Sequence, residues 1–464
     1  MARVAQGARQ LAFVAAIYAA ASGAAWAEVV LSPDQLRNAA VRSVEAGAAA
    51  QGLRFADALL HRDAGDFKAQ VLRARALRDL GRTDEAIAAG RTAWRMADSG
   101  TEKYASAMIM AQALSSAGHK TRAQFWLRRA AHHAPGPRAR TQVEQHYTYV
   151  RQTNALQTQL SFTLAPNSNI NNGSARDTSE LNYVVSEILF GGPVEYVLSG
   201  SAQALSGIEY GFGLNTRYRF HQTATRAHDL TLGLSYRTFS LSDSAKADAP
   251  MVDGGDFAFG TVMLGYGFRQ INLDARGEFQ SSAQLGQSWY GGAEYATRMR
   301  AGISQSYKIA PHQKAMLSLE HELQDGQRTV DMETTSISGS FTQNLSSGDL
   351  AYLSLGASVA TSPDANSEYD EVELRGAYVF RKPVAGAALQ LGMGVELRDY
   401  DVSRHSADGR QDKRIFADIT ATFQQFDYYG FNPSATLQAS RTDSNINLYD
   451  INRVGISIGI KSAF

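Results

Sequence analysis

The spacing of apolar residues changes near residue 155, and this change constrains the fold more than any other feature of the sequence. From there onward apolar side chains occupy every second position. The clearest row covers residues 208–220, where Ile208, Tyr210 and Phe212 begin a series that alternates with Glu, Gly, Asn and Arg. A period of two predicts β-strands with one apolar and one polar face. Residues 155–464 are therefore expected to form a sheet-rich domain.

Fourteen alternating segments can be drawn in this region. They cover residues 156–164, 208–220, 228–240, 256–268, 271–281, 289–308, 314–324, 332–344, 350–360, 371–381, 387–400, 413–425, 429–441 and 453–464. The number is even, and the connections after odd-numbered segments are longer than those after even-numbered ones, as in outer-membrane barrels. A soluble β-sandwich is the alternative, but rows of Tyr, Phe and Leu this long would aggregate in water. The prediction is a 14-stranded antiparallel transmembrane β-barrel over residues 155–464, in contact with outer-membrane lipid.

The last predicted strand ends in an aromatic residue. Its apolar row starts at Val454, continues through three isoleucines and finishes at Phe464. A terminal aromatic on an amphipathic last strand is typical of outer-membrane barrels. We therefore expect the barrel-assembly machinery to be a partner during biogenesis.

The first 27 residues have the three parts of a secretory signal peptide. Arg3 and Arg9 make the start positively charged, residues 11–25 are apolar or small, and Ala25-Trp26-Ala27 supplies a small–x–small cleavage pattern. This pattern predicts that residues 1–27 direct export and are removed.

Residues 28–150 are rich in Ala and Arg and are predicted to be helical. Two stretches there are similar to each other and to a tetratricopeptide repeat (TPR), in which a Gly ends the first helix, small residues let the helices approach, and a Pro closes the unit. The matching positions are Gly81, Ala86, Ala93, Gly118, Ala123, Ala130 and Pro135. A weaker third unit fits residues 50–66. The sequence thus predicts a periplasmic TPR-like helical domain over residues 28–150, which would present a surface to a client protein.

Composition argues against several other functions. The 45 basic and 45 acidic residues cancel, so no basic footprint for nucleic acid is present. The absence of Cys excludes disulfides, thiolate metal sites and cysteine nucleophiles. The ten His residues follow no metal-binding spacing, and no Ser/His or Asp/His constellation stands out. We expect a protein that is not an enzyme and that has no metal and no cofactor.

Two segments carry a resemblance to a known family. The first is Leu164-Ala165-Pro166-Asn167-Ser168-Asn169-Ile170-Asn171-Asn172. The second runs from Tyr429-Gly430-Phe431-Asn432-Pro433 through Ser444-Asn445-Ile446 to Tyr449-Asp450-x-Asn452-Arg453, just before the last strand. Together with the order of helical repeats and barrel, they resemble the surface lipoprotein assembly modifier family (Slam). The resemblance implies an outer-membrane translocator that moves a specific lipoprotein or soluble secreted protein from the periplasm to the cell surface.

Closure of the predicted barrel brings the two motif segments together, because its first and last strands must be neighbours. The candidate seam and motif residues are Asn167, Asn169, Ile170, Asn171, Pro433, Ser444, Asn445, Ile446, Tyr449, Asn452 and Phe464. Asn and Ser at this rim could bond backbone groups that a short or frayed strand pair leaves unpaired. Two interpretations stay open: simple capping of loop ends, or a weakly paired seam that opens sideways during transport.

Two other functions are compatible with helical repeats joined to a barrel. A passive outer-membrane porin would conduct ions without needing the helical domain. An exopolysaccharide exporter also joins TPR repeats to a barrel, although it would be expected to have many more repeats.

Overall fold

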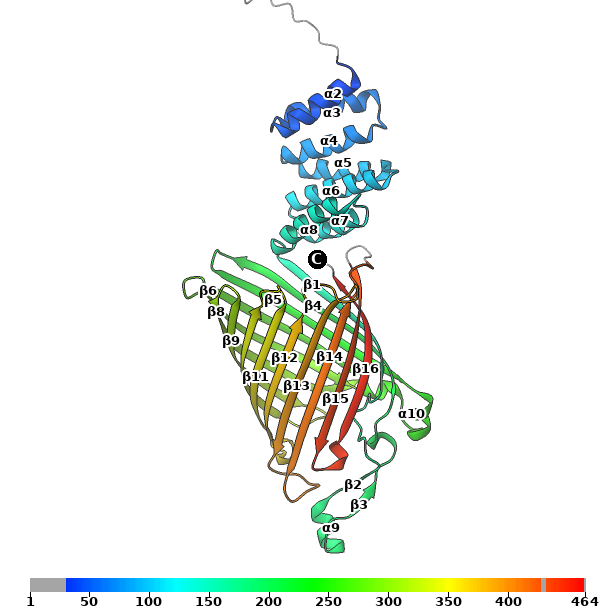
Figure 1. Ribbon diagram of the computed structural model, residues 1–464, viewed down its shortest axis with the longest axis vertical. Helices are drawn as coiled ribbons and strands as arrows, with labels where there is room; N and C mark the ends of the chain where they lie inside the picture. Colours follow the sequence, from blue (N-terminus) through cyan, green and yellow to red (C-terminus); the bar gives the residue numbers. More distant parts are fainter. Residues whose placement is uncertain (1–30, 427–430, 463–464) are drawn as a thin grey trace, which may run out of the picture. The chain divides into compact units, whose positions relative to one another are not determined.

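The computed structural model of the protein describes residues 31–426 and 431–462 (Figure 1). The predicted signal peptide and Phe464 lie outside these residues. The described chain forms two compact units, which divide between His119 and Lys120.

The first unit consists of α2 (Pro33–Glu45), α3 (Ala49–Arg62), α4 (Phe67–Asp79), α5 (Thr83–Met96) and α6 (Gly100–Ser116), each packed against the next. Capping side chains explain where three of these helices begin. Ser32 and Ser99 each form a capping box with the residue three positions later, and Asp66 accepts a hydrogen bond from the Ala69 N–H. These caps satisfy amide donors that have no partner in the first helical turn. None of the helices in residues 31–426 or 431–462 is long and apolar enough to cross a membrane.

The repeat positions have the backbone that their residue types favour. Gly81 and Gly118 adopt positive φ angles of 75° and 82°, and each ends its helix in a Schellman motif. Four small residues of the pattern, Ala86, Ala93, Ala123 and Ala130, are completely buried. Pro135 is exposed in the connection between the last two helices of the array.

The second unit begins with α7 (Lys120–His132) and α8 (Pro137–Gln152), which pack against each other and lead into the first strand. Asn154 fixes this junction. Its side-chain amide donates to the Thr121 hydroxyl at 3.1 Å and its carbonyl oxygen accepts from the Leu156 N–H at 3.1 Å.

Fourteen strands then form a closed antiparallel barrel, as the alternation predicted. They are β1 (Leu156–Asn167), β4 (Gly207–Gln222), β5 (Arg226–Leu241), β6 (Phe259–Asn272), β7 (Gly277–Tyr290), β8 (Ala293–Ala310), β9 (Gln313–Gly326), β10 (Met332–Asn344), β11 (Leu350–Thr361), β12 (Tyr369–Val379), β13 (Ala388–Tyr400), β14 (Arg410–Thr422), β15 (Phe431–Ser444) and β16 (Ile451–Ser462). Each strand pairs with its neighbours in sequence, and β1 closes the barrel against β16.

The two faces of the barrel wall differ in chemistry. Large apolar side chains at alternate positions are exposed on the outer face, as for Leu317 and Leu319 on β9. The intervening positions carry charged residues that pair across strands, such as Arg300 with Glu322. Since lipid covers the outer face of such a barrel and the interior is polar, this is the pattern of a membrane-spanning barrel.

Two details of the strand prediction were wrong. The predicted strand 271–281 spans a turn, because β6 continues to Asn272 and β7 starts at Gly277. Leu273, Asp274 and Ala275 all adopt positive φ angles there, and of the three only Asp is a residue type that favours turns. The connection after β7 is also not a long loop: Gly291 and Gly292, both with positive φ, turn directly into β8.

The longest connection lies between β1 and β4. It contains β2 (Thr178–Glu180) paired with β3 (Glu195–Val197), the helix α9 (Tyr183–Phe190) and the short helix η1 (Gly200–Ala202). The other connections hold α10 (Asp243–Asp248), η2 (Gly254–Phe257), η3 (Ala365–Ser367) and η4 (Asn447–Tyr449). At the base of the long connection an apolar cluster packs Ile170 and Leu205 against Phe239, Leu241, Ala245 and Ala249.

Candidate functional site at the β1–β16 seam

The contact between β1 and β16 is the most sparsely paired in the barrel. Among the described residues its ladder contains two pairs, Leu164 with Ile458 and Asn167 with Gly455. Every other pair of neighbouring barrel strands has ten partners or more. β1 is paired with β4 along its whole length, and β16 is paired with β15 over 431–442 and 451–462. Each strand of the seam is therefore held firmly on its other side.

Residue types at the seam explain the broken ladder. Pro166 lies between the two ladder pairs and has no N–H to donate. On β16, a Cβ added to Gly455 would lie 3.3 Å from the Pro166 carbonyl oxygen, and one added to Gly459 would lie 3.2 Å from that of Phe162. The two backbones are thus close, but β16 has no side chains at these positions to contact β1.

At its outer end the seam is held by hydrogen bonds that involve side chains. Ser168 donates its N–H to the Val454 carbonyl at 3.1 Å, and its hydroxyl accepts from the Val454 N–H at 2.9 Å. Asn169 is completely buried, and its side chain bonds both backbone groups of Gly173, at 3.0 and 2.8 Å. The same amide donates to the Asn452 carbonyl at 3.4 Å. Asn169 therefore shapes the turn after β1 and also reaches β16.

Neighbouring residues fix the turn from both sides. Arg453 donates to the Asn169 carbonyl at 3.0 Å and to the Asn172 side chain. Asn171 faces the other way: its amide donates to carbonyls of Ser201 and Gln203 at 2.8 and 2.9 Å and its oxygen accepts from the Leu205 N–H at 2.8 Å. Asn171 thereby ties the turn to the end of the same long connection, and not to β16.

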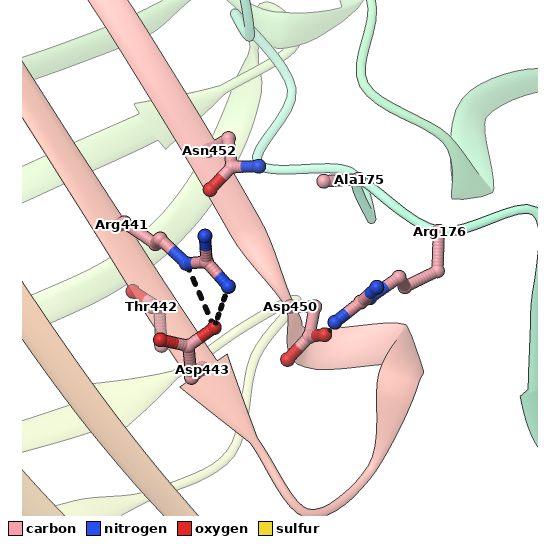
Figure 2. Close-up of a pocket in the computed structure, with 7 residues that line it drawn as sticks. All are labelled: Ala175, Arg176, Arg441, Thr442, Asp443, Asp450 and Asn452. Atoms are coloured by element: carbon pink, nitrogen blue, oxygen red, sulfur yellow. Dashed lines mark hydrogen bonds and ion pairs between the residues drawn. The ribbon is translucent and has the colours of Figure 1, made fainter.

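Asp450 is the centre of a second group of contacts further out (Figure 2). Its carboxylate accepts from the Arg176 guanidinium at 2.6 Å and from the Ser444 N–H at 2.7 Å, and its carbonyl accepts from the Ala175 N–H at 2.7 Å. The side chain of Asp450 is only 8% exposed. This one residue thus connects the β1–β4 connection to the β15–β16 turn.

Two serine hydroxyls complete these contacts. Ser174 donates to the Asn447 carbonyl at 2.6 Å, and Ser179 accepts from the Leu448 N–H at 3.0 Å. We call the contacts of Ser174, Ala175, Arg176 and Ser179 with Asn447, Leu448 and Asp450 the outer latch. A polar cavity of about 110 Å³ lies beside it, lined by Ala175, Arg176, Arg441, Thr442, Asp443, Asp450 and Asn452.

Some residues selected from the sequence lie away from the seam. Asn445 bonds the backbone of Gln411 and Gly409 and so extends the pairing of β15 with β14. The Arg410 guanidinium lies over the Tyr449 ring, with its central carbon 3.4 Å from the ring centroid. Pro433 pairs with Ile460 on β16, far from the motif at the outer rim.

The segment 444–446 contacts the seam only through its neighbours. The Ser444 N–H bonds Asp450, and the Ser444 hydroxyl accepts from the Ile446 N–H at 3.3 Å, which closes a local turn. Ile446 is 4% exposed. The bonds to the β1–β4 connection come from Asn447, Leu448 and Asp450, which follow this turn.

Sequence reasoning did not select the main residues of the outer latch, nor Arg453, which bonds the turn after β1. Asp450 and Arg453 stand inside the Tyr-Asp-x-Asn-Arg motif, so the motif was the available signal for both. Arg176 and the two serines follow no motif, and only their contacts reveal them. Asn432 was also not selected, yet it is 2% exposed and its amide donates to the carbonyls of Gln424 and Phe426.

A larger cavity of about 570 Å³ lies among the loops at the same rim. Arg398 stacks over Tyr369 at 4.4 Å, and Arg410 over Tyr400 at 4.4 Å. The α9 end of the long connection reaches this cavity through Asn182, whose N–H donates to Nδ1 of His405 at 3.1 Å. The loops after β1 and after β13 are therefore joined at this point.

A closed barrel of fourteen antiparallel strands with an apolar outer face, preceded by helical repeats, defines this chain as an outer-membrane β-barrel protein. The family model described as surface lipoprotein assembly modifier matches residues 157–464. The chain belongs to this family, which confirms the resemblance seen in the motifs.

Solved structures resemble the two parts of the chain separately. The type III secretion translocator chaperone SycD from Yersinia enterocolitica is similar at 18% identity over 26% of this chain and 92% of its own, with a TM-score of 0.24. An outer membrane channel from Pseudomonas putida is similar at 11% identity over 65% and 95%, with a TM-score of 0.31. A BenF-like porin from Pseudomonas fluorescens is similar at 12% identity over 66% and 98%, with a TM-score of 0.34. Similarities this low say nothing about what this chain binds or transports. No curated protein matches the chain.

Proposed function

We propose that this protein is an outer-membrane translocator that delivers a specific client, a lipoprotein or a soluble secreted protein, from the periplasm to the cell surface. The observation that carries the proposal is the match of the surface lipoprotein assembly modifier model to the whole barrel. The proposal includes no enzymatic step and no cofactor. Client movement would be driven by binding and by folding outside the cell.

The helical repeats would capture the client on the periplasmic side. An even number of strands places both ends of the barrel at one rim, and in outer-membrane barrels this is the periplasmic rim. Stacked helix pairs such as α2–α3 and α4–α5 present an extended surface of the kind that repeat proteins use for peptides and partner proteins. During biogenesis, the barrel-assembly machinery would insert the barrel.

The β1–β16 seam is the route that the geometry favours. Among the described strand residues, parting β1 from β16 breaks two ladder pairs, whereas any other strand pair would lose ten ladder partners or more. At a net value of about 1 kcal/mol for each backbone hydrogen bond, β1 and β16 are the least strongly paired neighbours along the barrel wall. The other bonds that hold the seam, those of Ser168, Asn169 and Arg453 and the outer latch, lie at its outer end. Its strands also stay attached to β4 and β15, so that the barrel would reclose in register.

Surface display in a heterologous outer-membrane host tests the function. A candidate client, taken from an adjacent gene, would be expressed with and without this protein, and external protease would score exposure while the medium is assayed for release. Exposure or release that depends on this protein supports translocation, and lipidation of the client decides between the two client classes.

A passive porin gives a different result in the same experiment. The client would stay periplasmic in both strains, while small solutes would leak through the barrel. That outcome would replace the translocator by a diffusion channel.

A further inference from the structure

The helix α9 exposes an apolar face at the outer side of the barrel. Five of its eight residues are large apolar side chains with exposed fractions between 52% and 77%, namely Val184, Val185, Ile188, Leu189 and Phe190. Val197 on β3 is 80% exposed. Soluble surfaces rarely gather so many exposed apolar side chains unless they bind a partner.

The face is continuous and held in place. Residues 184, 185, 188 and 189 share one side of a helix, since positions three and four apart are neighbours. Ser186 is completely buried on another side, and its hydroxyl donates to the Leu181 carbonyl at 3.1 Å. The Tyr183 N–H donates to the Arg404 carbonyl at 3.0 Å, so that the start of α9 is fixed to the loop after β13. We call residues 184, 185, 188 and 189 the α9 face.

Lipid does not account for this exposure. Figure 1 shows α9 beyond β2 and β3, past the ends of the barrel strands, whereas lipid covers the strand residues. The charged residues of this segment also argue against a contact with lipid. Residues 178–198 contain Glu180, Glu187 and Glu195 but no Lys or Arg, and helices that lie on membranes are usually rich in basic residues.

The shape and charge of the α9 face define the partner that fits it. A single helix is convex, so it cannot enclose a free acyl chain as a concave pocket would. An amphipathic peptide segment can lay its own apolar side chains along such a face. The charges that residues 178–198 themselves carry are all acidic, so basic residues at the edge of that segment would be attracted.

We propose that the α9 face is an extracellular docking site for an amphipathic segment of the client that carries apolar and basic residues. The inference rests on the proposed function, since it assigns α9 to the client as it emerges at the rim. Docking there would hold the segment outside the barrel and oppose its return.

A defined peptide pair tests the docking site directly. The full protein in phosphatidylcholine nanodiscs would be titrated with an amphipathic Leu/Lys peptide and with the matching Leu/Glu peptide, and empty nanodiscs would be measured in parallel. We expect the Leu/Lys peptide to bind more tightly. The variant Val185→Ser, Ile188→Ser, Leu189→Ser should weaken that binding by about tenfold or more for each side chain that the peptide buries.

A matched variant controls for general loss of apolar surface. Met251→Ser and Leu273→Ser remove exposed apolar side chains from two connections that do not contact α9 and should leave binding unchanged. Equal binding of both peptides, or equal loss in the control, would overturn the proposal. A change in oligomeric state of the α9 variant without a change in peptide binding would also overturn it, in favour of a second copy as the occupant.

Surface display separates this proposal from the function on which it rests. If the wild-type protein displays no client, the translocator itself fails. If the wild-type protein displays the client and the α9 variant displays it equally, with unchanged peptide binding, only the docking site fails. A photoreactive side chain at position 188 should form an adduct with the client in cells, whereas one at position 251 should not.

Discussion

At the scale of single residues, Asp450 makes two of the four bonds of the outer latch. Its backbone and its side chain both bond the β1–β4 connection, and the same carboxylate holds the Ser444 N–H. A nearly buried carboxylate is stable only when its lone pairs are satisfied, and here an amide and a guanidinium satisfy them. The latch is thus a small polar site that adds to the bonds of Ser168, Asn169 and Arg453 at the outer end of a sparse seam.

Asp450→Asn should loosen the latch without unfolding the barrel. The neutral side chain can still accept from Ser444 but loses the ion pair with Arg176. Because the Arg176 side chain is 53% exposed, the loss is expected to be about 1 kcal/mol. Faster protease cleavage within residues 168–206 of the intact protein would report it. Asp443→Asn breaks the exposed Arg441–Asp443 pair beside the same cavity and should leave the cleavage rate unchanged. Equal rates for all three proteins would contradict the role of Asp450.

We predict that His405 makes the contact between the outer loops sensitive to pH. Burial, together with the guanidinium groups of Arg404 and Arg410, lowers the pKa of His405 below its ordinary value of 6.5. Nδ1 accepts the Asn182 N–H, so the imidazole must be neutral for this contact. Asp364, which faces Arg404 at 3.9 Å, has a pKa lowered by hydrogen bonds from Asn366 and stays charged.

The sign of the pH effect follows from the lowered pKa. Once the loop is released, His405 binds protons more readily, so acid favours the released state. The contact is fully stable above about pH 6.5 and is lost as the pH falls through the lowered pKa of the bound state. Amide exchange at residues 180–190 should therefore speed up between about pH 7 and about pH 5 beyond its intrinsic pH dependence. His405→Gln keeps an acceptor and should abolish the excess, while the same excess in this variant would exclude His405 as its source.

At the scale of elements, the barrel wall is uneven. Among the residues that the structure describes, thirteen of the fourteen strand contacts are long ladders, and the β1–β16 contact is not. The physical cause is local to two strands, because Pro166 removes a donor while Gly455 and Gly459 remove side-chain contacts. A barrel wall of this kind should separate most easily between β1 and β16.

Locking the seam should stop transport if the client passes there. Leu164→Cys with Ile458→Cys joins ladder partners across β1 and β16, and the protein contains no other cysteine. We expect oxidised protein to lose client display and a reductant to restore it. Ile337→Cys with Ala357→Cys joins ladder partners of the long β10–β11 pair and should leave display intact when oxidised. Undiminished display by the locked seam would exclude this route while leaving translocation itself in place.

At the scale of the whole molecule, the chain combines two kinds of core. The helical unit buries small residues between helices: a Cβ on Gly52 of α3 would lie 2.4 Å from a Val44 methyl of α2 and 3.4 Å from the Ala40 carbonyl oxygen. The barrel instead turns its apolar side chains outward and fills its inner face with charged pairs. The two units should therefore respond separately to destabilisation.

Gly52→Leu should unfold the helical unit at a lower temperature and leave the barrel unchanged. The added side chain cannot fit between α2 and α3 without separating them, and such overpacking typically costs about 1–3 kcal/mol. Circular dichroism of the full protein in detergent, at helical and strand wavelengths, would show the two transitions. Gly100→Leu is the control, since a Cβ there meets nothing within 4 Å. A common shift of both transitions would contradict separate unfolding.

The sequence alone determined the barrel, its strand number and the type of the helical region. Each depends on a local pattern: alternation follows from having lipid on one face of the strand, and buried Ala with terminal Gly follows from close helix packing. Strand limits were less certain where the signal was weak, as at the turn 273–276 between β6 and β7.

Only the tertiary structure decided which residues hold the seam. Closure of the barrel places Arg176 beside Asp450 and Asn169 beside Asn452, partners more than 270 residues apart in the chain. In the same structure Asn445 bonds the Gln411 N–H of β14 and Asn171 bonds the Leu205 N–H, although both residues belong to the motif segments that supply the seam contacts. A motif shows that polar side chains gather at a rim, but register and loop path select the partner of each one. The physical reason is that a hydrogen bond requires a position and a direction, which a one-dimensional pattern does not contain.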